Sequence, residues 1–393
     1  MDNMGNEQVT ERSIDYNAVL TPPLSLGSGS DVEYRAPNIL QRILSLLKNV
    51  RPGSDLTRFQ AMQLPPLFNL PKSQLQCFGE SVYCVGDDMF RKCTDGKTAL
   101  DRFVAVVGWS ISTTRPAIFG VAPYNPILGE THHVSRDTLN VLLEQVSHHP
   151  PVTALHATDE QKNIKLIGCH NSIPKFNGTS VEVVVHGKWQ LKLLNFDENY
   201  VISSPKLSIR FFPVPSAEWV GNITIRCNET DLEAELCYRG PSFLGFRGSN
   251  RSVKGKIFDS TTSKTLFVID GHWDRTVQVR DVRNGKTTVI YEAKKTITRL
   301  KTPVVKDPKE LWPSESAVVW GELTQDILRK DWEKARGSKK AVEERERVLR
   351  KERECRNDTW IPNHFSLSYT KEEGWTCSPK QKWVPSAPIV APF

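Results

Sequence analysis

Two adjacent histidines followed by two prolines are the residues of this sequence whose types and order most directly suggest chemistry. In His148-His149-Pro150-Pro151, each imidazole can donate a hydrogen bond to a phosphate oxygen, while the proline rings restrict the backbone that carries them. A nearby phosphomonoester would raise the imidazole pKa and make these hydrogen bonds charge-assisted. The segment therefore predicts an anion site. The alternative is a strand on which one histidine is structural and the other exposed.

Neither nucleophilic catalysis nor metal binding is well supported. Ser147 adjoins His148, but chain neighbours rarely meet as nucleophile and base, and the sequence has no Gly-x-Ser-x-Gly motif. A second pair, His132-His133, suggests zinc, yet the spacings His-x-x-x-His and Cys-x-x-Cys are both missing. We therefore expect no enzyme activity, no metal and no cofactor, and we expect the eight cysteines to be free thiols.

The histidine pair lies inside a long region of short apolar or alternating segments, from about Ile118 to Thr298. Turn residues such as Asn177-Gly178 and Asn284-Gly285 separate these segments at intervals typical of an antiparallel sheet. Because no helices alternate with the strands, a parallel βαβ fold is disfavoured, whereas a barrel would remove the exposed edges of so many strands. Strands are predicted at residues 141–146, 181–185, 207–212, 223–227, 232–238, 266–270 and 287–291.

Helices are expected on both sides of this region. Residues 75–85 and 99–112 have the length and apolar content of a small helical pair, separated by an Asp95-Gly96 turn. After Pro308 the chain is helical again, and Glu343 and Arg347 stand at the four-residue spacing that supports an exposed helix. Sustained heptads are missing there, so we expect this helix to lie on the barrel rather than in a coiled coil.

A short amphipathic helix is predicted over residues 38–50. Its apolar side chains recur near helical period, and polar residues fill the other face. The apolar positions are Ile39, Leu40, Ile43, Leu44 and Leu47. Periodicity alone does not separate an ordinary core helix from an element that covers a site.

Composition and charge exclude few functions. The chain has 52 Lys plus Arg against 45 Asp plus Glu, and a net charge of +7 suits an anionic membrane surface or nucleic acid. The N-terminus is polar, without the apolar run of a secretory signal, and no stretch approaches the ~20 apolar residues of a membrane span. We therefore expect a cytoplasmic protein that is at most peripheral at membrane surfaces.

Two segments resemble those of a known family. Residues 144–151, EQVSHHPP, match the fingerprint of the oxysterol-binding protein family, and residues 125–130, NPILGE, match its NPxLGE segment. The resemblance extends from about Pro37 to Pro379 and points to a short, plant-like member without a pleckstrin-homology domain.

The resemblance implies a headgroup site for a phosphoinositide, typically phosphatidylinositol 4-phosphate. The implied site residues are Asn125, His148, His149, Arg345 and Arg353, the last two on a C-terminal helix that closes over the headgroup.

Two positions depart from the family pattern. Ala122 replaces a lysine, and Leu349 stands where an acidic residue is usual. The resemblance also makes residues 38–50 a lid over the mouth of a lipid tunnel.

Together these features predict an α+β fold, in which a large, nearly closed antiparallel β-barrel encloses a lipid tunnel. The expected parts are a flexible N-terminus (1–36), the lid helix and its connector (37–71), a small helical subdomain (72–116), the barrel (117–300), and a C-terminal helical subdomain with an extended tail (301–393).

The implied function is intracellular lipid binding and transfer, with sterol and/or phosphatidylinositol 4-phosphate held one at a time and exchanged between membranes. A lined tunnel removes the cost of exposing a lipid to water, ~0.8 kcal/mol per methylene. The alternative is a lipid-regulated sensor or scaffold with little bulk transport. Expected partners are these lipids and, transiently, anionic membrane surfaces. We expect no nucleic-acid binding and a monomer.

Overall fold

A fifteen-stranded sheet dominates the computed structural model, which describes residues 17–26, 38–56, 64–84, 88–240, 251–298 and 300–392. The strands are β3 (Thr131–Arg136), β4 (Leu139–His148), β5 (Pro151–Asp159), β6 (Ile164–Phe176), β7 (Ser180–Leu193), β8 (Glu198–Ile202), β9 (Lys206–Arg210), β10 (Ser216–Cys227), β11 (Leu232–Arg239), β12 (Ser252–Asp259), β13 (Thr265–His272), β14 (Thr276–Asp281), β15 (Thr287–Glu292), β16 (Val304–Val305) and β19 (Ile389–Val390). All seven predicted strand ranges overlap these strands.

The sheet follows the order of the chain for most of its width. From β3 to β15, sequential strands pair antiparallel, apart from β9, which lies beside β7 and β10. At the other end of the sheet, β3 pairs in parallel with β19, which leads to β16. This meander is the antiparallel arrangement that the turn spacing predicts.

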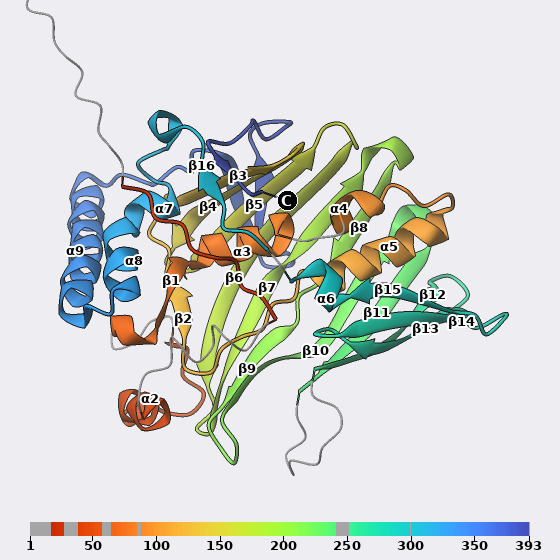
Figure 1. The fold of residues 1–393 in the computed structure, drawn as a ribbon, viewed down its shortest axis with the longest axis horizontal. Helices are drawn as coiled ribbons and strands as arrows, with labels where there is room; N and C mark the ends of the chain where they lie inside the picture. Colours follow the sequence, from red (N-terminus) through yellow and green to blue (C-terminus); the bar gives the residue numbers. More distant parts are fainter. Residues whose placement is uncertain are drawn as a thin grey trace, which may run out of the picture.

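Two helices, α3 (Gln74–Tyr83) and α5 (Ala99–Ser112), lie on the concave side of the sheet (Figure 1). Both begin with a capping box, in which Ser73 and Thr98 cap the first turn. A Cβ on Gly79 of α3 would lie 3.0 Å from His132 of β3, and one on Gly108 of α5 would lie 2.8 Å from the backbone oxygen of Ile290 of β15. Since β3 and β15 lie toward opposite ends of the strand order, the sheet curls around the helices as a nearly closed barrel.

A buried ion pair fixes α5 to the barrel wall. Arg102 donates to both carboxylate oxygens of Glu198 on β8, at 2.9 and 2.5 Å, and to the carbonyl of Gly96 at 3.1 Å. The hydroxyl of Tyr200 donates to the same carboxylate at 2.7 Å. The ion pair therefore fixes α5 against the sheet, and neither Arg102 nor Glu198 is left as an unpaired buried charge.

The remaining elements are one short separate helix and two outer layers. Helix α2 (Ile39–Leu47) lies in the segment predicted to be a lid, and β1 (Asn69–Ser73) pairs in parallel with β2 (Ala122–Tyr124). Short helices α4 (Met89–Lys92) and α6 (Ala293–Thr296) flank α5, while α7 (Ser316–Val319), α8 (Gly321–Leu328) and the long α9 (Trp332–Arg356) pack outside β1 and β2 (Figure 1). No helix of the described residues has both the length and the apolar character to cross a bilayer.

Part of the N-terminus, predicted to be flexible over 1–36, lies extended against the helices over residues 17–26. Val19 N donates to Ala317 O at 3.0 Å, and Lys72 Nζ donates to Pro22 O at 2.8 Å. Lys72 also forms a buried ion pair of 2.5 Å with Glu80 of α3. The N-terminal segment thus supplies, at Pro22, a backbone hydrogen-bond acceptor for the buried Lys72. The rest of the predicted flexible region lies outside the described residues.

The C-terminal region contains a hairpin that the sequence analysis did not predict. Strands β17 (Phe365–Thr370) and β18 (Gly374–Pro379) pack on β4 to β6, where Phe365 joins a buried cluster with Val146 and Val152. Cys377 of β18 is disulfide-bonded to Cys169 of β6. The expectation of eight free thiols is therefore wrong for these two, because a contact over 208 residues leaves no mark in cysteine spacing.

Three histidines with lowered pKa values predict a loss of stability in acid. Burial lowers the pKa of His148, His156 and His170 to about 4 in each case. Their ordinary value is about 6.5, so between pH 6.5 and 4 the unfolded chain binds more protons than the folded one, and stability falls as pH falls. His170→Leu should remove up to ~3 kcal/mol of this loss. Thermal unfolding from pH 7.5 to 4.5 checks this. His186→Leu, at an exposed position of β7, is the control. Equal slopes of stability against pH for the two variants would contradict the prediction for His170→Leu.

Candidate functional site

The NPILGE and EQVSHHPP segments are neighbours in space. Thr131 pairs with Glu144 across β3 and β4, Gly129 N donates to Gln145 O at 2.9 Å, and Gln145 N donates to Glu130 O at 2.8 Å. The two motifs therefore form one continuous piece of sheet, which ends at the histidine pair.

The two glutamates of these motifs hold the framework together. Glu130 is fully buried and accepts from Ser316 Oγ at 2.7 Å, Trp320 Nε1 at 2.9 Å and Ile127 N at 3.0 Å, and also from Ser73 Oγ. Burial raises the pKa of Glu130, and these hydrogen bonds oppose that rise. The carboxylate thereby joins the end of β1, the start of β3 and the two ends of α7 at one point.

Glu144 connects the sheet to the C-terminal region. Its carboxylate accepts from the backbone nitrogens of Asn363 and His364 at 2.7 and 2.8 Å. Both backbone donors directly precede β17. Glu144 thus fixes the segment that leads from α9 into the hairpin.

The histidines lie at the end of β4, where the chain turns into β5. His148 pairs with Pro151 across the turn, and the rings of His148 and His149 meet edge-on with centroids 4.7 Å apart. Burial lowers the pKa of His148 to about 4, helped by His149 and opposed by a hydrogen bond to the carbonyl of Pro126. Nδ1 of His148 has no hydrogen-bond partner among the described residues. His148 is therefore a neutral ring whose unpartnered Nδ1 is enclosed by the protein.

Arg350 of α9 brings a positive charge to this turn. Its Nη1 lies 3.3 Å from Nε2 of His149, and burial together with the charge of Arg350 lowers the pKa of His149. Arg350 also lies 3.6 Å from Glu354, but its side chain remains 44% exposed. A guanidinium beside two imidazoles at a partly exposed surface is suited to bind a phosphate group.

The end of α9 is held over the NPILGE segment by Trp360. A Cβ on Gly129, whose φ is +78°, would lie 2.6 Å from Cζ2 of Trp360, so only glycine fits under this ring. The guanidinium of Arg353 lies 5.9 Å from the centre of the same ring. Arg353 therefore lies at the helix end that covers the NPILGE segment.

Arg345 has different surroundings. Its side chain is 59% exposed and lies 3.8 Å from Glu346. At ~100° per residue it is about 140° around the helix from Arg350. The structure thus does not bring Arg345 to the histidine pair, and Leu349, which departs from the family pattern, is 38% exposed. Arg350 was not among the predicted site residues, because counting along a helix does not show which face meets the barrel.

A lysine stands next to Ala122, where the family pattern has a cation. Lys339 Nζ donates to Asn69 Oδ1 at 2.8 Å, and Asn69 Nδ2 donates to Ala122 O at 3.2 Å. Burial lowers the pKa of Lys339, and the nearby Glu343 opposes this. Lys339 is therefore linked to the backbone of Ala122 through the side chain of Asn69. Asn125, three residues further, is exposed and adjoins Pro126, whose carbonyl binds His148.

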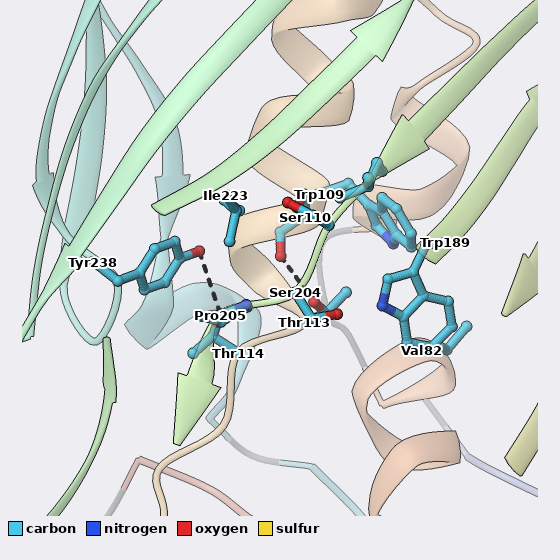
Figure 2. Close-up of a pocket in the computed structure, with 12 residues that line it drawn as sticks. Val82, Trp109, Ser110, Thr113, Thr114, Trp189, Ser204, Pro205, Ile223 and Tyr238 are labelled. Atoms are coloured by element: carbon cyan, nitrogen blue, oxygen red, sulfur yellow. Dashed lines mark hydrogen bonds between the residues drawn. The ribbon is translucent and has the colours of Figure 1, made fainter. Parts of the chain in front are cut away.

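The interior of the barrel contains a narrow pocket with a cavity volume of about 50 Å³ (Figure 2). A ligand the size of a sterol would have to widen it, because small-molecule sites typically enclose ~300–1,000 Å³. Aromatic and aliphatic groups share its wall with hydroxyls, and Nε1 of Trp109 is buried without a hydrogen-bond partner among the described residues. Thr114 and Tyr238 meet at 3.5 Å across it. The lining residues are Val82, Trp109, Ser110, Thr113, Thr114, Trp189, Ile202, Ser203, Ser204, Pro205, Ile223 and Tyr238.

Helix α2, which is predicted to be a lid, lies over the ends of β6, β7 and β9. Leu47 is 6% exposed and belongs to a cluster with Phe176, Val181 and Phe211, against which Leu40 and Ile43 also pack. A Cβ on Gly120 would lie 2.5 Å from Ile39, so this residue also faces the protein. Leu44 differs from the other four predicted lid residues because it is 45% exposed.

Comparisons with known proteins agree with this geometry. The family model described as oxysterol-binding protein matches residues 42–386. Oxysterol-binding protein-related proteins 4B and 4A of Arabidopsis thaliana are 51% and 49% identical to this chain, over 97% of it in both cases and over 100% and 98% of their own lengths. Human oxysterol-binding protein-related protein 5 is 29% identical over 88% of this chain and 40% of its own length.

Solved structures share the fold. The Osh1 ORD domain in complex with ergosterol aligns over 93% of this chain and 91% of its own, with a TM-score of 0.73 and 22% identity. The Osh3 ORD in complex with PI(4)P from Saccharomyces cerevisiae aligns over 92% of this chain and 94% of its own, with a TM-score of 0.67 and 20% identity.

Proposed function

This chain belongs to the oxysterol-binding protein family, and on that premise we propose that it carries one sterol or one phosphoinositide at a time and exchanges the two between membranes. The observation that mainly supports the proposal is the 3.3 Å approach of Arg350 to His149, beside a neutral His148 with an unpartnered nitrogen. This group can receive a phosphomonoester at the rim of the barrel. Phosphatidylinositol 4-phosphate is the expected ligand.

The phosphate would change the protonation of the histidine pair. Without a ligand, burial and Arg350 lower the pKa of His149, and His148 has a pKa of about 4. A phosphate dianion within hydrogen-bond distance raises both pKa values and lets each ring donate. Arg350 supplies positive charge beside the histidine pair.

The pocket inside the barrel supports the apolar half of the proposal. Trp109 and Trp189 provide aromatic surface for a rigid hydrocarbon, whereas Nε1 of Trp109 and the hydroxyl of Tyr238 can bind the polar end of a sterol. The Osh1 and Osh3 domains, which bind a sterol and a phosphoinositide respectively, share this fold and support the same two lipid classes here.

Transfer between two vesicle populations tests the proposal. Donor vesicles contain a fluorescent sterol, acceptor vesicles contain phosphatidylinositol 4-phosphate, and the protein is added at about one molecule per hundred sterols. We expect sterol to reach the acceptor faster than with acceptors that contain unphosphorylated phosphatidylinositol. Tight loading of lipid without transfer at this ratio would contradict exchange and favour a lipid-regulated sensor or scaffold.

A further inference from the structure

Two strongly exposed apolar side chains lie in one turn. Residues 211–215, the docking turn, connect β9 to β10, and within it Phe212 is 68% and Val214 is 65% exposed. Among the large apolar side chains of the described residues, only Ile361, at 72%, is more exposed. Isolated exposed apolar residues are common, but two in five residues call for an explanation.

The docking turn is held rigidly. Phe211 is 5% exposed, its ring lies 6.3 Å from that of Phe119, and its backbone nitrogen donates to Thr179 O at 3.0 Å. Pro213 and Pro215 fix φ and carry no N–H, so the turn is unsuited to pair with a strand of another protein. Phe211 thus anchors the turn, and the side chains of Phe212 and Val214 extend into solvent.

The lid helix extends this apolar end. Phe211 and Leu47 of α2 belong to the same buried cluster, and Leu44, one helical turn before Leu47, is 45% exposed. Figure 1 shows α2 and the loop after β9 at the same end of the molecule. Leu44, Phe212 and Val214 are therefore exposed apolar groups on one end of the barrel.

Positive charge surrounds this end. The segments that meet here, residues 38–56, 175–182 and 206–216, contain six Lys and Arg but two Asp and Glu, a net charge of 6 − 2 = +4. Glu182 already pairs with Lys206 at 3.0 Å. The side chains of Arg42, Lys48, Arg51 and Lys175 are exposed. Exposed apolar groups within a basic surround are complementary to an anionic bilayer.

We propose that this end of the protein docks on an anionic lipid bilayer, with Phe212 and Val214 inserted below the headgroups. The proposal rests on the lipid-exchange function above and adds the residues that make contact with the membrane. A bilayer fits better than a protein partner because two side chains on a narrow turn offer far less than the ~800 Å² per partner of a stable protein interface. The basic side chains would lie at the level of the lipid phosphates.

Flotation of the full chain with vesicles tests this directly. The vesicles contain phosphatidylcholine with 0 or 30% phosphatidylserine, and the test variant is Phe212→Asp with Val214→Asp. Val289→Asp is the matched control, because Val289 on β15 is 54% exposed outside this end. We expect the double variant to bind anionic vesicles at least about tenfold more weakly, the control to bind as the wild type does, and phosphatidylserine to strengthen binding of the wild type.

A second readout separates this proposal from the lipid-exchange function. Sterol is delivered from a cyclodextrin complex, without a bilayer, and we expect equal loading of wild type and double variant. Failure of the wild type to load would count against the lipid-exchange function. Equal vesicle binding by both proteins would overturn the docking proposal, and so would a variant that lost only self-association in gel filtration, since the turn would then bind a second copy.

Discussion

The double replacement His148→Ala with His149→Ala should weaken binding of phosphatidylinositol 4-phosphate by at least about 100-fold and leave sterol loading within about twofold. Each imidazole is expected to give one charge-assisted hydrogen bond to the phosphate, worth ~1.5–3 kcal/mol, and two such bonds account for a loss of this size. The histidines lie at the barrel rim, whereas the proposed sterol pocket is lined by other residues. Extraction of each lipid from vesicles measures both effects.

A third histidine provides the control for this experiment. His186 of β7 is exposed and outside the motif, so His186→Ala should bind both lipids normally. Arg350→Ala should weaken phosphoinositide binding alone, since Arg350 contacts His149 and does not line the pocket. If the double histidine variant loses sterol and phosphoinositide equally, the pair is structural and the headgroup assignment is wrong.

Leu47→Asp should shorten the retention of either bound lipid at least about tenfold. Leu47 is 6% exposed among Phe176, Val181 and Phe211, and an unpaired carboxylate in such a cluster costs several kcal/mol. The expected response is release of α2 from the barrel rather than global unfolding, because α2 is a short peripheral helix. Release of fluorescent sterol into excess empty vesicles measures retention, and circular dichroism checks the fold.

Leu44→Asp makes the same chemical change on the same helix. The sequence pattern groups Leu44 with the four other apolar residues of the predicted lid, but its 45% exposure makes it the control. We expect Leu44→Asp to retain lipid as the wild type does and to bind anionic vesicles less well. Equal retention by wild type, Leu44→Asp and Leu47→Asp would show that α2 does not act as a lid.

Local signals explain why much of the fold could be predicted. Each strand of an antiparallel meander pairs with its chain neighbours, so period-two segments and intervening turn residues are sufficient to locate β10 and β11. Helices α3 and α5 begin at capping boxes that stand in the sequence at Ser73 and Thr98. The histidine pair could be predicted as a candidate site because its two histidines and the two prolines that follow them are adjacent in the chain.

The features that sequence did not show depend on contacts between distant residues. Arg350 meets His149 across 201 residues, and only the packing of α9 decides that this arginine, rather than Arg345, faces the turn. The Cys169–Cys377 disulfide depends on where the C-terminal hairpin docks. Lys339, likewise, approaches Ala122 through Asn69, and no pattern within α9 indicates that contact.

Native mass spectrometry of the purified protein is the most direct test of one shared lipid site. The protein is measured before and after incubation with vesicles that contain a sterol and phosphatidylinositol 4-phosphate. We predict one bound lipid per chain, with each species displacing the other as its share in the vesicles rises. Simultaneous binding of both lipids to one chain, or a protein that remains empty under all these conditions, would contradict the exchange of two lipids through one site.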